Sequence, residues 1–176
     1  MDFVKEILNM INEEIFQSSL ITTDKLCFED AVREACERNY CGRYNKCWTC
    51  PPACGEVSEL QKKLTAYKNV FIFTTVHSVE DSFDIEGMHS AHLAHNKITA
   101  KIKELCDECG ATVLGAGGCT VCKKCTYPDA ACRFPKKAIV SIEASGINVM
   151  TLSKTAGINY INGTNTVTYF SAVFFN

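Results

Sequence analysis

The chain has 176 residues, of which 47% are hydrophobic and 22% are charged, a composition typical of one globular domain with its own core. Its formal net charge of −2 provides no general attraction to nucleic acid or to an anionic membrane, so we expect neither as a partner. No stretch approaches the roughly 20 apolar residues that a membrane-spanning helix needs. The unusual feature of the composition is its twelve cysteines.

Clustered cysteines are typical either of disulfides in a secreted chain or of metal ligands and redox groups in an intracellular one. The segment Met1–Phe16 has neither the basic start nor the continuous apolar centre of a signal peptide. We therefore expect a cytoplasmic protein with metal-binding or redox-active thiols, and disulfides are the alternative. The apolar residues of this segment instead predict an amphipathic helix that packs on the core. Its apolar stripe consists of Phe3, Val4, Ile7, Leu8, Ile11 and Ile15.

Two helices and one buried strand are expected after Ser18-Ser19 breaks the first helical pattern. Residues Phe28–Arg38 and Ser58–Tyr67 have helical patterns, and Ser58 is expected to cap the second helix. The run Val70–Val76 is almost continuously apolar and rich in β-branched and aromatic residues, which is typical of a strand buried on both faces. Between the two helices, prolines and glycines in residues 36–55 predict a cysteine-rich loop.

The second half of the chain begins with its longest helical stretch, Met88–Leu105. Gly110 stands where a left-handed residue would end that helix. The apolar residues Ala111–Leu114 then predict a short strand. Further on, Asn148–Ala156 predicts a short helix that Gly157 ends.

The remaining segments complete a single α/β domain over residues 1–176. Alternation and aromatic content in Thr166–Phe175 predict a final strand, whereas Lys136–Ala144 is compatible with a strand or a helix. We therefore predict a central sheet of three or four strands flanked by helices. Because Ala111–Leu114 leads directly into cysteine-rich sequence, we expect the metal-binding loops at or near one end of the sheet.

The second cysteine loop, residues 118–135, carries thiols at the spacing Cys-x2-Cys-x2-Cys-x6-Cys. A Cys-x2-Cys step lets two thiolates converge on one metal centre, and its repetition is typical of an iron–sulfur loop more than of a zinc site. Six residues precede the last cysteine, where the bacterial ferredoxin run has three. We expect an iron–sulfur cluster here, with zinc as the alternative. The candidate ligands are Cys119, Cys122, Cys125 and Cys132.

The first cysteine loop, residues 36–55, holds five thiols within nineteen residues, and we expect a second metal centre there. Pro51 and Pro52 stiffen the backbone directly after Cys50, which lowers the entropy cost of holding that thiolate in place. The alternative for Cys36 is a small buried residue of a helix. The candidate ligands are Cys36, Cys41, Cys47, Cys50 and Cys54.

Other candidate groups have simpler interpretations. Cys106 and Cys109 would form a zinc knuckle with the next cysteine pair, but the gap of nine residues is short, so we expect these two thiols to be structural or spare. The segment from Gly115 to Gly118 lacks the Lys-Ser/Thr ending of a phosphate-binding loop, so we expect close packing around a cluster.

Three histidines, His89, His92 and His95, recur at three-residue steps on the long helix. Six residues correspond to a rotation of about 240°, so all three cannot face one ion. We expect partly exposed polar positions, and a neighbouring pair of ligands is the alternative. His77, at the end of the buried strand, has no visible partner in the sequence.

Basic residues surround the second cysteine loop. They would stabilise a negatively charged cluster, dock an acidic redox partner or simply be solvated. These residues are Lys123, Lys124, Arg133, Lys136 and Lys137.

Three sequence blocks, in order along the chain, resemble one known family. They are Cys36-x4-Cys41-Gly-x-Tyr44-x3-Trp48-x-Cys50-Pro-Pro; Gly118-Cys119-x2-Cys122-x2-Cys125-x-Tyr127-Pro128-x3-Cys132-Arg-x-Pro135 with Ser141-x-Glu143-Ala144-x-Gly146-Ile147-x-Val149; and Asn162-Gly163-x-Asn165-Thr166-Val167-x-Tyr169-Phe170. Together they resemble the predicted metal-binding proteins of mostly anaerobic prokaryotes known as domain of unknown function twenty-two eighty-four. The resemblance implies metal binding but no particular reaction. Its first block contains neither Cys47 nor Cys54, which leaves the fourth ligand of the first centre open.

The leading hypothesis is an iron–sulfur protein with up to two [4Fe–4S] clusters that exchanges single electrons with a redox partner protein. The second cysteine loop would hold one cluster; Cys41, Cys50 and two of Cys36, Cys47 and Cys54 would hold the other. Three alternatives stay open: an iron–sulfur enzyme with an open cluster site for a small molecule, a zinc protein whose metal holds the fold, and a metal-delivery protein.

Overall fold

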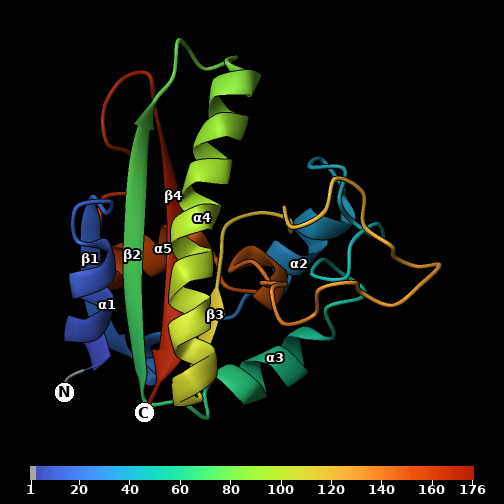
Figure 1. Ribbon diagram of the computed structural model, residues 1–176, viewed down its shortest axis with the longest axis horizontal. Helices are drawn as coiled ribbons and strands as arrows, with labels where there is room; N and C mark the ends of the chain where they lie inside the picture. The colour runs from blue at the N-terminus through green and yellow to red at the C-terminus, as the bar shows by residue number, and fades with distance from the viewer. Residues whose placement is uncertain (1–2) are drawn as a thin grey trace.

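The computed structural model describes residues 3–176, which form a four-stranded antiparallel sheet of order β1-β2-β4-β3 and five α-helices (Figure 1). The predicted α/β class, with a sheet flanked by helices, is confirmed. The strands are β1 (Gln17–Thr22), β2 (Asn69–Ser78), β3 (Thr112–Leu114) and β4 (Thr166–Phe175). The helices are α1 (Phe3–Ile11), α2 (Asp30–Glu37), α3 (Val57–Leu64), α4 (Ile85–Cys109) and α5 (Val149–Ala156).

The two long strands, β2 and β4, form the centre of the sheet and pair from Asn69 with Phe175 to Ser78 with Thr166. Successive side chains of a strand point to opposite faces of its sheet. Phe71 and Phe73 of β2 belong to one hydrophobic core, whereas Val70 and Ile72 belong to another. The prediction that this strand is buried on both faces is therefore confirmed.

Helices cover both faces of the sheet. On one face, α1 contributes Ile7 and Ile11 to the core, and α4 contributes Ile98, Ile102 and Leu105. The first helix thus packs as its apolar stripe predicted. The other core takes one buried leucine each from α3 and α5, together with buried residues from the segment that precedes α5. None of the helices in residues 3–176 has both the length and the apolarity needed to cross a membrane.

Some local predictions were wrong. The Ser18-Ser19 segment belongs to β1, an edge strand that pairs with β2; only Ile21 of this strand is buried, so its hydrophobic signal is weak. The N-cap of α3 is Glu56, so the helix begins one residue before Ser58. Similarly, α4 begins at Ile85, since the Asp84 side chain caps it.

The segment 136–144 forms neither a helix nor a strand along most of its length. Ser141 makes an isolated parallel bridge with Gly115, and a short 3-10 helix, η2, follows at Glu143–Ser145. This bridge ties the end of the second cysteine loop to the residue directly after β3.

Both cysteine-rich segments gather in what we call the cysteine lobe, residues 30–56 and 115–148. Figure 1 shows this lobe beside the β3 edge of the sheet, on the side away from β1. The sequence predicted loops at or near one end of the sheet; because β3 is a short edge strand, the loops instead extend sideways from that edge.

Candidate metal centre

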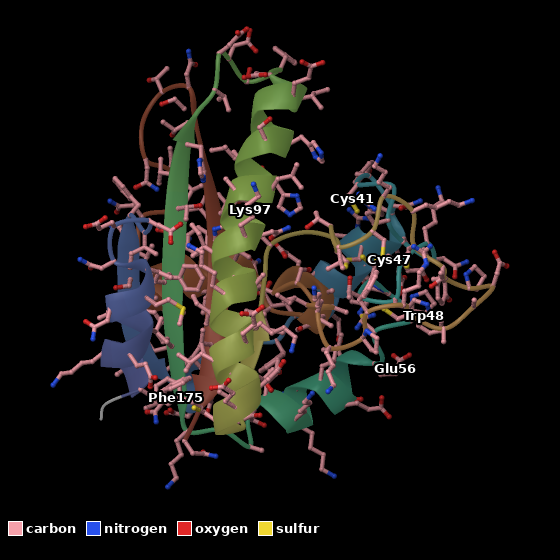
Figure 2. All side chains as sticks on the ribbon, in the orientation of Figure 1. Cys41, Cys47, Trp48, Glu56, Lys97 and Phe175 are labelled. Atoms are coloured by element: carbon pink, nitrogen blue, oxygen red, sulfur yellow. The ribbon has the colours of Figure 1, made fainter. Side chains whose placement is uncertain are left out.

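An aromatic pair joins the two cysteine loops. The Trp48 indole N–H donates to the carbonyl of Ala130 at 3.1 Å, and the Tyr127 hydroxyl donates to Asn45 Oδ1 at 3.0 Å. The Trp48 and Tyr127 rings meet edge to face, with centroids 4.9 Å apart. Each loop therefore buries part of its surface against the other. Figure 2 shows Cys41, Cys47 and Trp48 close together in the lobe.

Cys47 is the thiol at which the two loops meet, and it is only 1% exposed. Its sulfur lies near the thiols of Cys119 in the second loop and Cys50 in its own loop. Interaction with these two thiols lowers the pKa of Cys47 and raises the pKa of Cys50 and Cys119. The Thr49 hydroxyl lies 3.4 Å from the Cys47 sulfur. Negative charge is therefore favoured on Cys47.

One small cavity collects thiols from both loops. Arg43 and Arg133 also line it, and their positive charges would favour thiolates there. The four predicted ligands of the second loop thus lie around a common space, together with a fifth thiol from the first loop. The cavity cysteines are Cys47, Cys119, Cys122, Cys125 and Cys132.

A second group of thiols lies around the end of α2. Burial raises the pKa of Cys36, and the nearby charges of Cys41, Glu143 and Cys54 act in the same direction. Burial also raises the pKa of Cys54, while the positive charge of Arg33 opposes it. The charge of Cys41 contributes to the raised pKa of Cys50 as well. The second group therefore consists of Cys36, Cys41, Cys50 and Cys54.

Arg33 is a half-buried cation beside this second group. One of its terminal nitrogens lies 3.8 Å from the Cys54 sulfur, and the other donates to the carbonyls of Gly55 at 2.8 Å and Ala144 at 3.0 Å. Within residues 3–176, its Nε has no hydrogen-bond partner, nor has the buried Oε2 of Glu143, whose pKa is raised by burial. A half-buried guanidinium whose shielded Nε–H is a spare donor fits an anionic group held by these thiols.

The thiols are grouped but not yet arranged as a closed ligand set. Among residues 3–176, no three Cys, His, Asp or Glu side chains converge closely enough to hold one metal ion. The donor chemistry nevertheless fits a soft metal, because sulfur ligands suit iron–sulfur clusters and zinc. Binding would need the thiols to turn toward a common point.

The glycine run Gly115–Gly118 is closely packed, as predicted. A Cβ on Gly118 would lie 3.1 Å from Cγ of Arg43, and one on Gly117 would lie 3.0 Å from Nε2 of His92. Gly117 also has a φ of +61°, which disfavours other residues. These glycines let the first loop and α4 approach the backbone next to Cys119.

The histidines lie outside both thiol groups. His92 bonds to the carbonyl of Ala116 through Nε2 at 2.6 Å. The expectation of partial exposure was wrong for His95, which is fully buried because Thr75 and Ser171 of the two central strands supply partners for both ring nitrogens. His77 shares the Thr75 hydroxyl at 2.9 Å, a partner that the sequence did not reveal.

The remaining cysteines also lie elsewhere. Cys106 is fully buried in the core under α4, where burial raises its pKa to about 12. Cys109 is exposed at the end of the same helix. The structural role predicted for Cys106 is therefore confirmed. Sequence reasoning missed Arg33 and Arg43, because the thiols that they approach lie in other segments: Cys54 is 21 residues after Arg33, and Arg43 lines a cavity with cysteines of the second loop.

The fold is an α/β domain whose lobe beside the sheet contains nine cysteines, and this arrangement defines a cysteine-rich protein with a candidate metal centre. Residues 19–175 match the family described as Predicted metal-binding protein (DUF2284), and the chain belongs to this family. The match confirms the resemblance of the three sequence blocks. No curated protein and no solved structure shows significant similarity to the chain.

Proposed function

We propose that this protein is a cytoplasmic iron–sulfur protein that carries up to two [4Fe–4S] clusters and exchanges electrons with a redox partner protein. The observation that carries this proposal is the position of Cys47, which belongs to the first loop but lines one cavity with Cys119 and the other cysteines of the second loop. Two thiol groups are thereby adjacent, and adjacent centres are what electron transfer between clusters requires.

The two groups suggest a ligand set for each centre. The second loop would hold one cluster through Cys119, Cys122, Cys125 and Cys132. The other would be held by Cys36, Cys41, Cys50 and Cys54. The proximity of Arg33 to Cys54 supports Cys54 over Cys47 as a ligand of this centre, since Cys47 turns toward the other loop.

A bound [4Fe–4S] cluster would supply one-electron redox chemistry. The chain contributes the electrostatic environment. Arg33 would donate to the sulfurs of the group around the end of α2, and Arg43 and Arg133 would lie beside the thiols of the second loop. Such donors and cations stabilise the reduced cluster and raise its potential. The exposed Lys123 and Lys124 would attract an acidic surface of the redox partner.

Zinc is the second candidate, because sets of four thiols also suit structural zinc ions. Metal analysis separates the two. After anaerobic purification, we expect about eight iron and eight sulfide per chain, as two [4Fe–4S] clusters require, and an EPR signal after dithionite reduction. Stoichiometric zinc without labile sulfide would overturn the iron–sulfur proposal.

Single cysteine variants test the two ligand sets. Cys122→Ala should remove the second-loop cluster, and Cys54→Ala should remove the other, each leaving about half the iron. Cys109→Ser is the matched control, because Cys109 is exposed on α4 and should leave iron and sulfide unchanged. Full cluster content in Cys122→Ala would contradict the proposed ligands.

A further inference from the structure

A cavity of about 280 Å³ lies next to the cysteine lobe, between α4 and the glycine run. Asn96 and Lys97 line it from α4, and the stretch from Gly115 to Val121 lines it from the other side. Figure 2 shows Lys97 on α4 at the level of the lobe. Cys119 borders both this cavity and the smaller cavity of the thiols. The volume suits a small metabolite.

The charged residues that line the cavity are all positive. Lys97 and Lys137 line it from segments that are far apart in the sequence, and no lining residue is acidic. Within residues 3–176, neither lysine takes part in an ion pair. Two exposed lysines that line one cavity without a carboxylate favour an anionic ligand.

Uncharged donors in the wall favour the same kind of ligand. In the part of the chain that the structure describes, the backbone N–H groups of Gly117 and Gly118 donate to no protein acceptor. Thr120 Oγ1 accepts a hydrogen bond from Asn96 at 3.2 Å, which leaves its own hydrogen available as a donor. Free N–H and O–H groups near two lysines are suited to bind carboxylate oxygens.

The rest of the wall is apolar. Leu93 and Ala100 of α4 line one side, and Val121 and Ile139 lie among the residues opposite. A fully hydrated inorganic anion would gain nothing from these side chains, whereas a short hydrocarbon body would be removed from water by them. The cavity therefore combines a polar, cationic part with an apolar part.

We propose that this cavity binds a small carboxylic acid of about four to six carbons, with its carboxylate near Lys97 and Lys137 and its hydrocarbon part against the apolar wall. This site goes beyond the proposed function and does not depend on it, because no cavity contact requires a metal. Since Cys119 borders the cavity, the bound acid lies next to the thiol site.

Calorimetric titration with hexanoate and succinate tests the proposal on the purified protein, both metal-loaded and metal-free under reducing conditions. We expect at least one of the two acids to bind and hexanamide, which lacks the charge, to bind at least about tenfold more weakly, a loss of about 1.4 kcal/mol. Lys97→Met and Lys137→Met should each weaken binding by about tenfold. Lys97→Arg, which keeps the charge, should retain most of the affinity.

Lys123→Met is the matched control, because Lys123 is exposed on the lobe outside this cavity. The proposal would be overturned by any of three results: no binding of either acid at concentrations of about 10 mM, equal affinity for hexanamide, or unchanged affinity in both lysine variants. Iron and sulfide analysis of the same samples separates the two proposals: acid binding without iron would refute only the iron–sulfur function, and iron without acid binding would refute only this site.

Discussion

His95 shows at the scale of one residue how the sheet and α4 fit together. Both ring nitrogens are satisfied, by Thr75 on β2 and by Ser171 on β4, and the Thr99 hydroxyl bonds to Ser171 at 2.9 Å. The ring of Tyr169 packs beside the imidazole, with centroids 5.8 Å apart. Burial, together with smaller effects of the charges of His92 and His77, lowers the pKa of His95 to about 3.

This lowered pKa predicts a pH dependence of stability. The unfolded chain binds a proton on His95 near pH 6.5, whereas the folded protein does so only near pH 3. Between these values the unfolded state holds more protons, so the free energy of unfolding falls as pH decreases, by up to about 1.4 kcal/mol per pH unit. Above pH 6.5 this contribution is constant.

Replacing His95 tests whether its titration causes this pH dependence of the free energy of unfolding. In urea unfolding of the metal-free, reduced protein, His95→Gln should lose less stability than wild type between pH 7 and pH 5. His89→Gln, at an exposed position of α4, should behave like wild type. Equal pH slopes for wild type and His95→Gln would contradict a neutral, buried His95.

At the scale of elements, α4 is the main cover of one sheet face, and Ile102 is fully buried in that core. Ile102→Ala leaves a cavity among rigid neighbours and should lower the free energy of unfolding by about 2–5 kcal/mol. Glu104→Ala, on the exposed side of the same helix, should change it by about 0.5 kcal/mol or less. Chemical denaturation of both variants measures the difference; a loss for Ile102→Ala as small as that of the control would show that α4 is not firmly packed.

At the scale of the whole molecule, the sheet and the cysteine lobe are held together by different interactions. Among residues 3–176, neither hydrophobic core cluster includes any of the nine candidate ligands. The sheet is stabilised by apolar burial, to which Ile142 and Ile147 at the end of the lobe also contribute. The two cysteine loops instead rely on the Trp48–Tyr127 contact, on Arg33 and on their thiols. A bound metal should therefore hold the lobe more than the sheet.

Removal of metal by a chelator from the loaded protein tests this division. Hydrogen exchange should show lost protection in residues 41–55 and 119–135, while β2 and β4 remain protected and far-UV circular dichroism changes little. Addition of chelator to a sample purified without metal serves as the control. Unfolding of the sheet on metal removal would instead show that metal binding is what folds the chain.

Local signals in the sequence determined most of the helices and strands of this protein and where several of them end. Burial on both faces of β2, the left-handed end of α4 at Gly110 and the α5 helix between Asn148 and Gly157 were predicted, because each depends on residues adjacent in the chain. The edge strand β1 was missed, because its pairing is provided by β2 and not by its own pattern. Spacing likewise indicated that the four thiols of the second loop lie around one space, but it did not indicate that Cys47 of the first loop lines the same space.

Only the tertiary structure decided which groups meet across the two loops. Cysteine spacing limits the distance between thiols of one loop, but it says nothing about a thiol in another. The contact of Cys47 with Cys119 depends on the glycine run that admits Arg43 and on the aromatic pair that joins the loops. The cavity between Lys97 and Lys137 arises in the same way, because packing of α4 against the lobe brings together residues that the sequence keeps far apart.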